Sequence, residues 1–117
     1  MSNRYEVPEG STAPLDFQLR NVTRDPDTGI ETESEFDATG MTVAIVVRDR
    51  TNALVPTITV AWLVIAESKV RVSFQAASLV ASLGPYTFRF EVTDGAGKIH
   101  KYPMSVDPDF FDVGFAA

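Results

Sequence analysis

Apolar and polar residues alternate most clearly in residues 86–93, between a Gly-Pro turn and an Asp-Gly turn. Tyr86, Phe88, Phe90 and Val92 take every second position, and polar or charged residues stand between them. Successive side chains of a β-strand point to opposite faces of a sheet. The pattern therefore predicts a strand with one buried and one solvated face.

The same alternation recurs along the chain and predicts further short strands. They are expected at residues 14–20, 41–48, 55–62, 69–74, 98–106 and 110–115. Residues 1–12 are polar and suit an extended N-terminal arm or a short edge strand, whereas residues 75–82 break the period and suit a helical turn. The long connection 21–40 either contains a hairpin around residues 27–29 or is partly disordered.

These elements predict an all-β fold, because short strands recur without the long helices of a parallel α/β sheet. We expect an antiparallel immunoglobulin-like sandwich of about seven strands with one short helical turn. A single domain would span residues 13–117, with residues 1–12 as its arm. Another Greek-key or jelly-roll sandwich with an aromatic core is the alternative.

Four aromatic residues are expected to form the centre of the core: Trp62, Tyr86, Phe88 and Phe90. The spacing of Ser, Gly and Tyr over residues 82–86 is typical of a tyrosine corner. In that motif a Tyr hydroxyl hydrogen bonds to an upstream backbone group. Trp62 is the only tryptophan and lies on a mid-chain strand, so we expect its ring to pack against Phe88.

Composition and charge narrow the class of protein. The 117 residues include no cysteine, which excludes disulfides and thiolate metal sites. The net charge of −6 disfavours binding to nucleic-acid phosphates and to anionic membranes. No apolar run approaches the ~20 residues of a membrane helix, and the N-terminus lacks the apolar stretch of a signal peptide. We expect a soluble domain made in a cytoplasm.

The sequence contains no recognisable catalytic motif. His100 is the only histidine, and the sequence reveals no partner for it, which favours a surface histidine over a catalytic one. Motifs of the serine-nucleophile type and glycine-rich phosphate loops are absent. We therefore expect neither an enzyme nor a cofactor.

Oxygen-bearing side chains alternate in the segment around residue 27 and suggest a weak calcium candidate. Asp25, Asp27 and Glu31 would supply the ligands, with Gly29 as the turn residue. Pro26 stiffens the segment, and the twelfth position of a calcium loop holds Phe36 instead of Glu. A solvated acidic hairpin is the favoured interpretation.

Three phenylalanines, Phe110, Phe111 and Phe115, crowd the last residues of the sequence. Either they complete the core, which is favoured, or they cover a neighbouring subunit as an apolar interface. Tyr5 and Tyr102 are the candidates for rings that would stack on a sugar.

Several stretches together resemble the immunoglobulin-like N-terminal domain of phage baseplate upper proteins and of related small tail and prophage proteins. They comprise residues 9–17 with a Pro-Leu-x-Phe start, 36–43, 46–49, 83–98 with its Gly-Pro-Tyr strand and Asp-Gly turn, and the Pro103 strand. Ala38 departs from the leucine of that pattern, and the 21–35 loop is longer. The matching positions serve the fold, so the resemblance transfers no binding residues.

The resemblance implies a non-enzymatic building block of a virion, located in the particle or in the host cytoplasm during assembly. Its partners would be other virion or tail proteins or further copies of itself. The alternative is a carbohydrate- or surface-binding immunoglobulin-like module, and an enzyme or metal-dependent protein is the third hypothesis.

Overall fold

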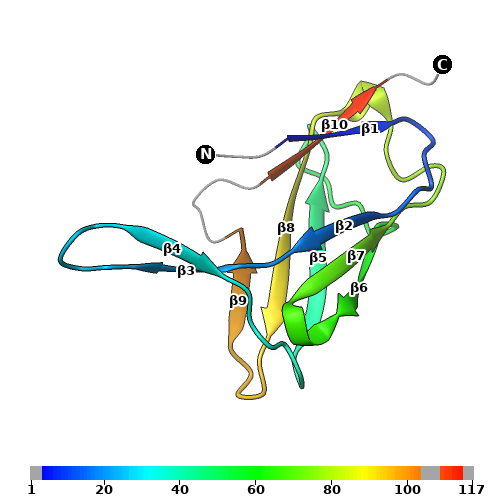
Figure 1. Cartoon of the computed structure of the whole chain (residues 1–117). Helices are drawn as coiled ribbons and strands as arrows, with labels where there is room; N and C mark the ends of the chain where they lie inside the picture. The colour runs from blue at the N-terminus through cyan, green and yellow to red at the C-terminus, as the bar shows by residue number, and fades with distance from the viewer. Residues whose placement is uncertain (1–3, 104–108, 115–117) are drawn as a thin grey trace.

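The computed structural model describes residues 4–103 and 109–114, and these residues form an all-β protein, as the sequence predicted (Figure 1). The described residues contain ten strands and two short 3-10 turns. The strands are β1 (Arg4–Pro8), β2 (Leu15–Gln18), β3 (Asn21–Arg24), β4 (Glu31–Ser34), β5 (Thr42–Arg48), β6 (Thr59–Val64), β7 (Lys69–Ser73), β8 (Tyr86–Thr93), β9 (Ile99–Tyr102) and β10 (Asp109–Gly114). The turns are η1 (Ile65–Glu67) and η2 (Ala81–Leu83).

The expected count of about seven strands and one helical turn is too low for the described residues. Each strand predicted from alternation has a counterpart, in β2, β5, β6, β7, β8, β9 and β10. The additional strands are β1, which is the short edge strand left open for residues 1–12, and β3 and β4, which form the hairpin left open for the long acidic connection. Strands β3 and β4 lack an apolar row, and the row of β1 is limited to Tyr5 and Val7, so the signal used to find the other strands is missing or short in them. Residues 104–106 of the predicted return strand lie outside the described residues.

Two sheets make up the body of the molecule. In the larger sheet the strands follow the order β1-β10-β8-β5, and β9 also pairs with β8. The first residues of β8 pair with β10 and its last residues pair with β9, so β9 and β10 lie end to end along one edge of β8. The smaller sheet has the order β2-β7-β6. The expectation of purely antiparallel pairing is wrong at one place, because β1 runs parallel to β10.

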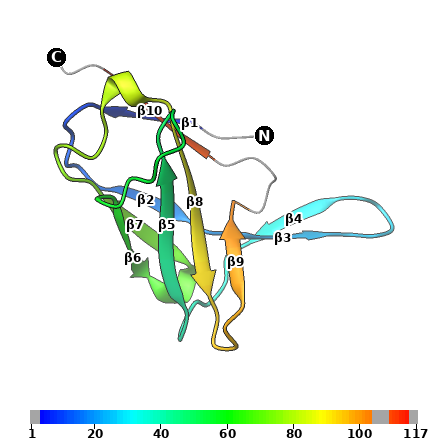
Figure 2. The ribbon, with the colours of Figure 1, turned by 180° about the vertical axis from the view of Figure 1, so that it is seen from behind.

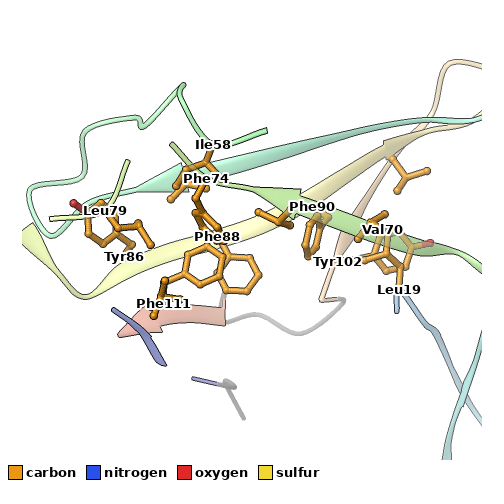
Figure 3. Packing of buried hydrophobic residues seen from close by; sticks show 14 residues of the cluster. Leu19, Ile58, Val70, Phe74, Leu79, Tyr86, Phe88, Phe90, Tyr102 and Phe111 are labelled. Carbon is orange, nitrogen blue, oxygen red and sulfur yellow. The ribbon is translucent and has the colours of Figure 1, made fainter. Parts of the chain in front are cut away.

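An aromatic core lies between the two sheets (Figure 3). Phe17 on β2 faces the larger sheet, where its ring centroid lies 5.5 Å from the centroids of both Phe88 and Phe90. Phe88 stacks on Phe111 with 4.0 Å between centroids and 10° between ring planes. Burial of such large apolar groups is the main stabilising term of the fold.

The predicted packing of Trp62 against Phe88 is wrong. Among the described residues, the rings in contact with Phe88 are those of Tyr5, Phe17, Phe90 and Phe111. Trp62 is half-buried at the margin of the core, and its indole N–H donates a 3.0 Å hydrogen bond to the Met41 carbonyl. An indole N–H that is withdrawn from water needs a hydrogen-bond acceptor. The acceptor, Met41, lies just before the first residue of β5, whereas Val47, which pairs with Phe88, lies near the other end of that strand.

The predicted tyrosine corner is confirmed. The Tyr86 hydroxyl accepts a 2.9 Å hydrogen bond from the Val80 amide and lies 3.3 Å from the Val80 carbonyl, to which it donates. Tyr86 is only 1% exposed. These hydrogen bonds therefore tie Val80, the residue just before η2, to the buried Tyr86 at the start of β8.

The hairpin of β3 and β4 stands out sideways from the body of the molecule (Figures 1 and 2). A compact chain of this length has a radius of gyration of about 13 Å. The observed value is 15.1 Å, and the longest extent is 49 Å. We call residues 21–35 the projecting hairpin.

Candidate interaction site

The projecting hairpin has one acidic face and one neutral face. Cross-strand pairs share a face, and the register pairs Val22 with Glu33 and Arg24 with Glu31. The other face carries only neutral polar side chains, from the pairs Asn21 with Ser34 and Thr23 with Thr32. Every residue from 22 to 35 is exposed. The hairpin therefore contributes no side chain to the core and presents two chemically different surfaces.

The turn of the projecting hairpin is closed by its own groups. The Gly29 amide donates to the Asp25 carbonyl at 2.8 Å, and the Asp27 amide donates to Asp25 Oδ1, also at 2.8 Å. Gly29 has a φ of +73°, a conformation that glycine adopts at low cost. Ile30 follows at the tip and is 64% exposed.

The base of the projecting hairpin is anchored to the body by side chains. The Tyr102 hydroxyl donates a 2.6 Å hydrogen bond to Asn21 Oδ1, and the Tyr102 ring stacks on Phe36, just beyond the other end of the hairpin. Gln18 Nε2 donates to Glu35 Oε2 at 2.6 Å. Both ends of the hairpin are thus held in place, although its length is exposed.

A buried serine completes this anchor. Ser68 is fully buried, and its Oγ lies 2.7 Å from the Leu19 carbonyl and 3.3 Å from the Phe36 amide, which donates to it. The Ser68 carbonyl accepts a 2.9 Å hydrogen bond from the Leu19 amide. One side chain therefore joins the chain entering the hairpin to the chain leaving it.

The second surface is a hollow of about 640 Å³ on the outer face of the larger sheet, which we call the outer groove. Residues of β5 and β8 alternate between the core and this face, so Val46 and Arg89, which pair in the register, both point outward. The lining residues are Val46, Arg48, Asn52, Leu54, Thr87, Phe88, Arg89, Glu91 and Lys101. In Figure 2 the strands that carry this face lie toward the viewer.

The outer groove is basic around an apolar patch. Its charged residues are Arg48, Arg89, Lys101 and a single acid, Glu91. Arg48 Nη1 donates to the Asn52 carbonyl at 3.1 Å, and Arg89 Nη1 donates to the Pro103 carbonyl at 3.1 Å. These bonds hold both guanidinium groups at the groove. Leu54, at 60% exposed, supplies the apolar surface.

His100 has a partner that the sequence did not reveal. Its Nε2 lies 2.9 Å from Asp94 Oδ2 at the β8–β9 turn. Asp94 Oδ1 also accepts hydrogen bonds from the amides of Ala96 and Lys98. The hydrogen bond with His100 is the largest cause that lowers the pKa of the Asp94 carboxyl, and the Lys98 amide comes next.

This Asp–His pair closes the turn between β8 and β9. Catalysis by such a pair requires a nucleophile or substrate on the other ring nitrogen. Within residues 4–103 and 109–114, the side-chain hydrogen bond of His100 is the one to Asp94. An Asp at the first position of a short hairpin followed by a His six residues later was the sequence signal available for the pair.

The calcium candidates Asp25, Asp27 and Glu31 do not form a ligand set. They lie on the exposed projecting hairpin, and the described residues contain no cluster of three His, Cys, Asp or Glu able to hold a metal ion. Asp25 instead accepts a hydrogen bond within the turn. The hairpin interpretation of this segment is confirmed.

Two of the three C-terminal phenylalanines lie in the described part of the chain, and they differ in burial. Phe111 is completely buried against Phe88 and Phe74, so the favoured core interpretation is confirmed for this residue and the interface alternative is wrong for it. Phe110 is half-buried, with the Arg4 guanidinium 4.5 Å above its ring. Phe115 lies outside the described residues. Tyr86, Phe88 and Phe90 all lie in the core.

The rings considered for sugar stacking are buried or half-buried. Tyr102 is 4% exposed, and Tyr5 is half-buried with its ring 4.9 Å from that of Phe17. The buried Tyr102 ring therefore offers no open face for stacking on a sugar, and the Tyr5 ring is partly covered.

Compared with known proteins, the chain matches no protein-family model and no curated protein sequence. No helix among the described residues has the length and apolar character needed to cross a membrane.

Proposed function

We propose that this protein is a non-enzymatic structural module of a phage or prophage virion, in a tail, baseplate or decoration, that acts through protein–protein contacts. It works in the virion, or in the host cytoplasm during assembly, without a cofactor and without nucleic acid or membrane as a partner. The observation that carries this proposal is the projecting hairpin.

The projecting hairpin is difficult to explain by the stability of the domain alone. An isolated two-stranded hairpin is marginally stable in water. Here all side chains from residue 22 to residue 35 are exposed, yet Tyr102, Gln18 and Ser68 hold the base. Exposed segments mounted on a rigid scaffold commonly carry binding contacts. A contact with another protein would give this segment the burial that it lacks in the single chain.

We also propose that the body is an immunoglobulin-like sandwich with the projecting hairpin as an insertion. Strands β2, β7 and β6 then correspond to B, E and D of that fold, and β5 and β8 correspond to C and F. Strand G is divided between β9 and β10. The hydrogen bonds between Tyr86 and Val80 supply the tyrosine corner that is typical of the fold.

The sequence resemblance supports the same conclusion. The Gly-Pro-Tyr segment and the Asp-Gly turn that carry it border the central strand β8. Because these positions serve the fold, they favour a family of architectural domains over an enzyme family. The half-buried and buried positions of Tyr5 and Tyr102 weigh against the carbohydrate-binding alternative.

Sedimentation of the protein with virus particles tests this proposal. We expect the tagged protein, made in cells that produce the phage or induced prophage, to sediment with tails or whole particles in a density gradient. Binding to those particles should be lost when Glu31→Lys and Glu33→Lys change the hairpin face. A chain that stays at the top of the gradient, and instead binds a defined glycan, would support the carbohydrate-binding alternative.

A further inference from the structure

Two surfaces of this molecule complement each other in charge: the acidic face of the projecting hairpin and the outer groove. We propose that the projecting hairpin of one copy binds in the outer groove of a second copy. The inference rests on the proposed function, because it specifies which surfaces make a contact between subunits.

The projecting hairpin is acidic as a whole, and Glu31 and Glu33 are the carboxylates on the face proposed to enter the groove. Residues 21–35 contain five carboxylates and one guanidinium, a net charge of −4. Glu31 and Glu33 share a face with Arg24. The opposite face, with Thr23 and Thr32, is uncharged. Only one of the two faces therefore favours a basic partner.

The outer groove carries more basic than acidic residues. Arg48, Arg89 and Lys101 line the outer groove together with one acid, Glu91. The single cation of the hairpin face, Arg24, therefore also has a counterpart of opposite charge. Complementary potentials of this kind select the partner and fix its register more than they raise affinity.

Apolar groups at both surfaces supply the burial that charge pairs alone do not provide. Ile30 at the hairpin tip is 64% exposed, and Leu54 in the groove is 60% exposed. The groove volume of about 640 Å³ lies within the ~300–1,000 Å³ typical of binding clefts. Several hairpin side chains fit such a space. Covering both aliphatic groups removes apolar surface from water, which favours association.

The contact joins two different surfaces of the same chain. The projecting hairpin extends beyond the edge of the sheet that carries the groove, in both views (Figures 1 and 2). A contact between unlike surfaces generates a ring when the rotation closes, and a filament when it does not. Either product suits a building block that is repeated in an assembly.

Sedimentation velocity of the full chain at increasing concentration tests the proposal directly. We expect association that weakens as salt rises from about 0.05 to about 0.5 M, because the charges lie at the surface. Glu31→Gln with Glu33→Gln should weaken it by about tenfold. Thr23→Lys with Thr32→Lys changes the net charge by the same amount on the neutral face, and it should leave the association within about twofold of wild type.

A charge-swap experiment identifies the two surfaces as partners. The hairpin variant Glu31→Lys/Glu33→Lys and the groove variant Arg48→Glu/Lys101→Glu should each associate at least about tenfold more weakly than wild type. Mixing them should restore association, because each altered surface then meets one of opposite charge. Thermal unfolding of each variant confirms that it is folded.

Three aliphatic residues provide a matched test of the apolar contact. Ile30→Ser and Leu54→Ser should each weaken association by about tenfold. Ile99→Ser is the control, because Ile99 is as exposed as Leu54 but does not line the groove. An equal effect of all three substitutions would contradict the assignment.

The inference is overturned by a wild-type chain that stays monomeric at about 1 mM, or by association that the charge swap does not restore. Either result leaves the proposed function standing if the protein still sediments with virus particles. Loss of sedimentation with particles, while copies still associate through these surfaces, would refute the proposed function and leave this inference intact.

Discussion

The Tyr102 hydroxyl donates a 2.6 Å hydrogen bond to Asn21 Oδ1, and this bond joins the end of β9 to the first residue of the projecting hairpin. The Tyr102 ring stacks on Phe36 with 5.4 Å between centroids. A single buried side chain therefore contacts the segments that enter and leave the hairpin. Contacts between the body and the base of the hairpin therefore help to set the direction in which the hairpin projects.

Tyr102→Phe should lower the free energy of unfolding by about 1 kcal/mol. The substitution keeps the ring and its stacking on Phe36 and removes only the donor to Asn21. Amide hydrogen exchange in residues 21–35 should become faster, because the base of the hairpin is held less firmly. Chemical denaturation and exchange measured by mass spectrometry check both effects. Unchanged exchange in the hairpin would show that the bond does not hold it.

Tyr102 also predicts a loss of stability at alkaline pH. Burial raises the pKa of its phenol above the ordinary value of 10.0. The unfolded chain therefore releases this proton at a lower pH than the folded chain, and stability declines as pH rises above about 10. Denaturation curves of wild type and Tyr102→Phe should converge over this range. Parallel curves up to the folded pKa would contradict the assignment.

Ser68 lies in the left-handed region, with a φ of 53°, while its hydroxyl is buried and hydrogen bonded. Ser68→Ala keeps this conformation and leaves the Leu19 carbonyl and the Phe36 amide without their partner. We expect Ser68→Ala to lower the free energy of unfolding by about 1–3 kcal/mol. Ser68→Gly loses the same hydrogen bonds but adopts the conformation more easily, so it should cost about 1 kcal/mol less.

Urea unfolding of both Ser68 variants checks which of them is the less stable. The urea midpoints can be compared directly if the dependence of the unfolding free energy on urea concentration is the same for both. Equal losses for the two variants would mean that the left-handed conformation carries no strain. A Ser68→Ala variant with an unchanged free energy of unfolding would show that water replaces the hydroxyl at this site.

The two adjacent phenylalanines of β10 should respond very differently to truncation. Phe111→Ala leaves a cavity beside Phe88 and should cost about 3–5 kcal/mol, with Phe111→Leu as a milder variant if folding fails. Phe110→Ala mainly removes the contact with the Arg4 guanidinium and should cost about 1 kcal/mol. Thermal unfolding of the variants measures the difference. Similar losses for Phe110→Ala and Phe111→Ala would contradict the burial of Phe111.

Much of the body could be predicted because its strands bury one face. Strand β8 is fully alternating, so its position and inner row follow from the sequence, and the Gly-Pro-Tyr turn predicts the corner at Tyr86. The position of Trp62 could not be predicted in this way. Its distance from Phe88 depends on how strands far apart in sequence align, and alternation says nothing about alignment.

The candidate site was harder to predict for two physical reasons. Strands β3 and β4 have no fully buried residue and no apolar row, so only the turn residues around Gly29 indicate a hairpin. The outer groove exists because β5, β8 and β9 are neighbours in the sheet, which brings Arg48, Arg89 and Lys101 together from distant positions. Such pairings follow from tertiary packing and leave no local signal.

The pair of Asp94 and His100 predicts a loss of stability in acid. The hydrogen bond with His100, followed by those from backbone amides, holds the pKa of the Asp94 carboxyl below its ordinary value of 3.8. A carboxyl with a lowered pKa stabilises the folded state above its unfolded pKa, and the contribution is lost as pH falls through the folded pKa. Asp94→Asn should therefore lower the melting temperature at neutral pH, and the two melting curves should converge below about pH 4. Calorimetry at a series of pH values measures this difference, and His100→Gln separates the share of the imidazole from that of the amides. A difference between wild type and Asp94→Asn that persists unchanged to about pH 2 would show that the carboxylate charge does not stabilise the turn.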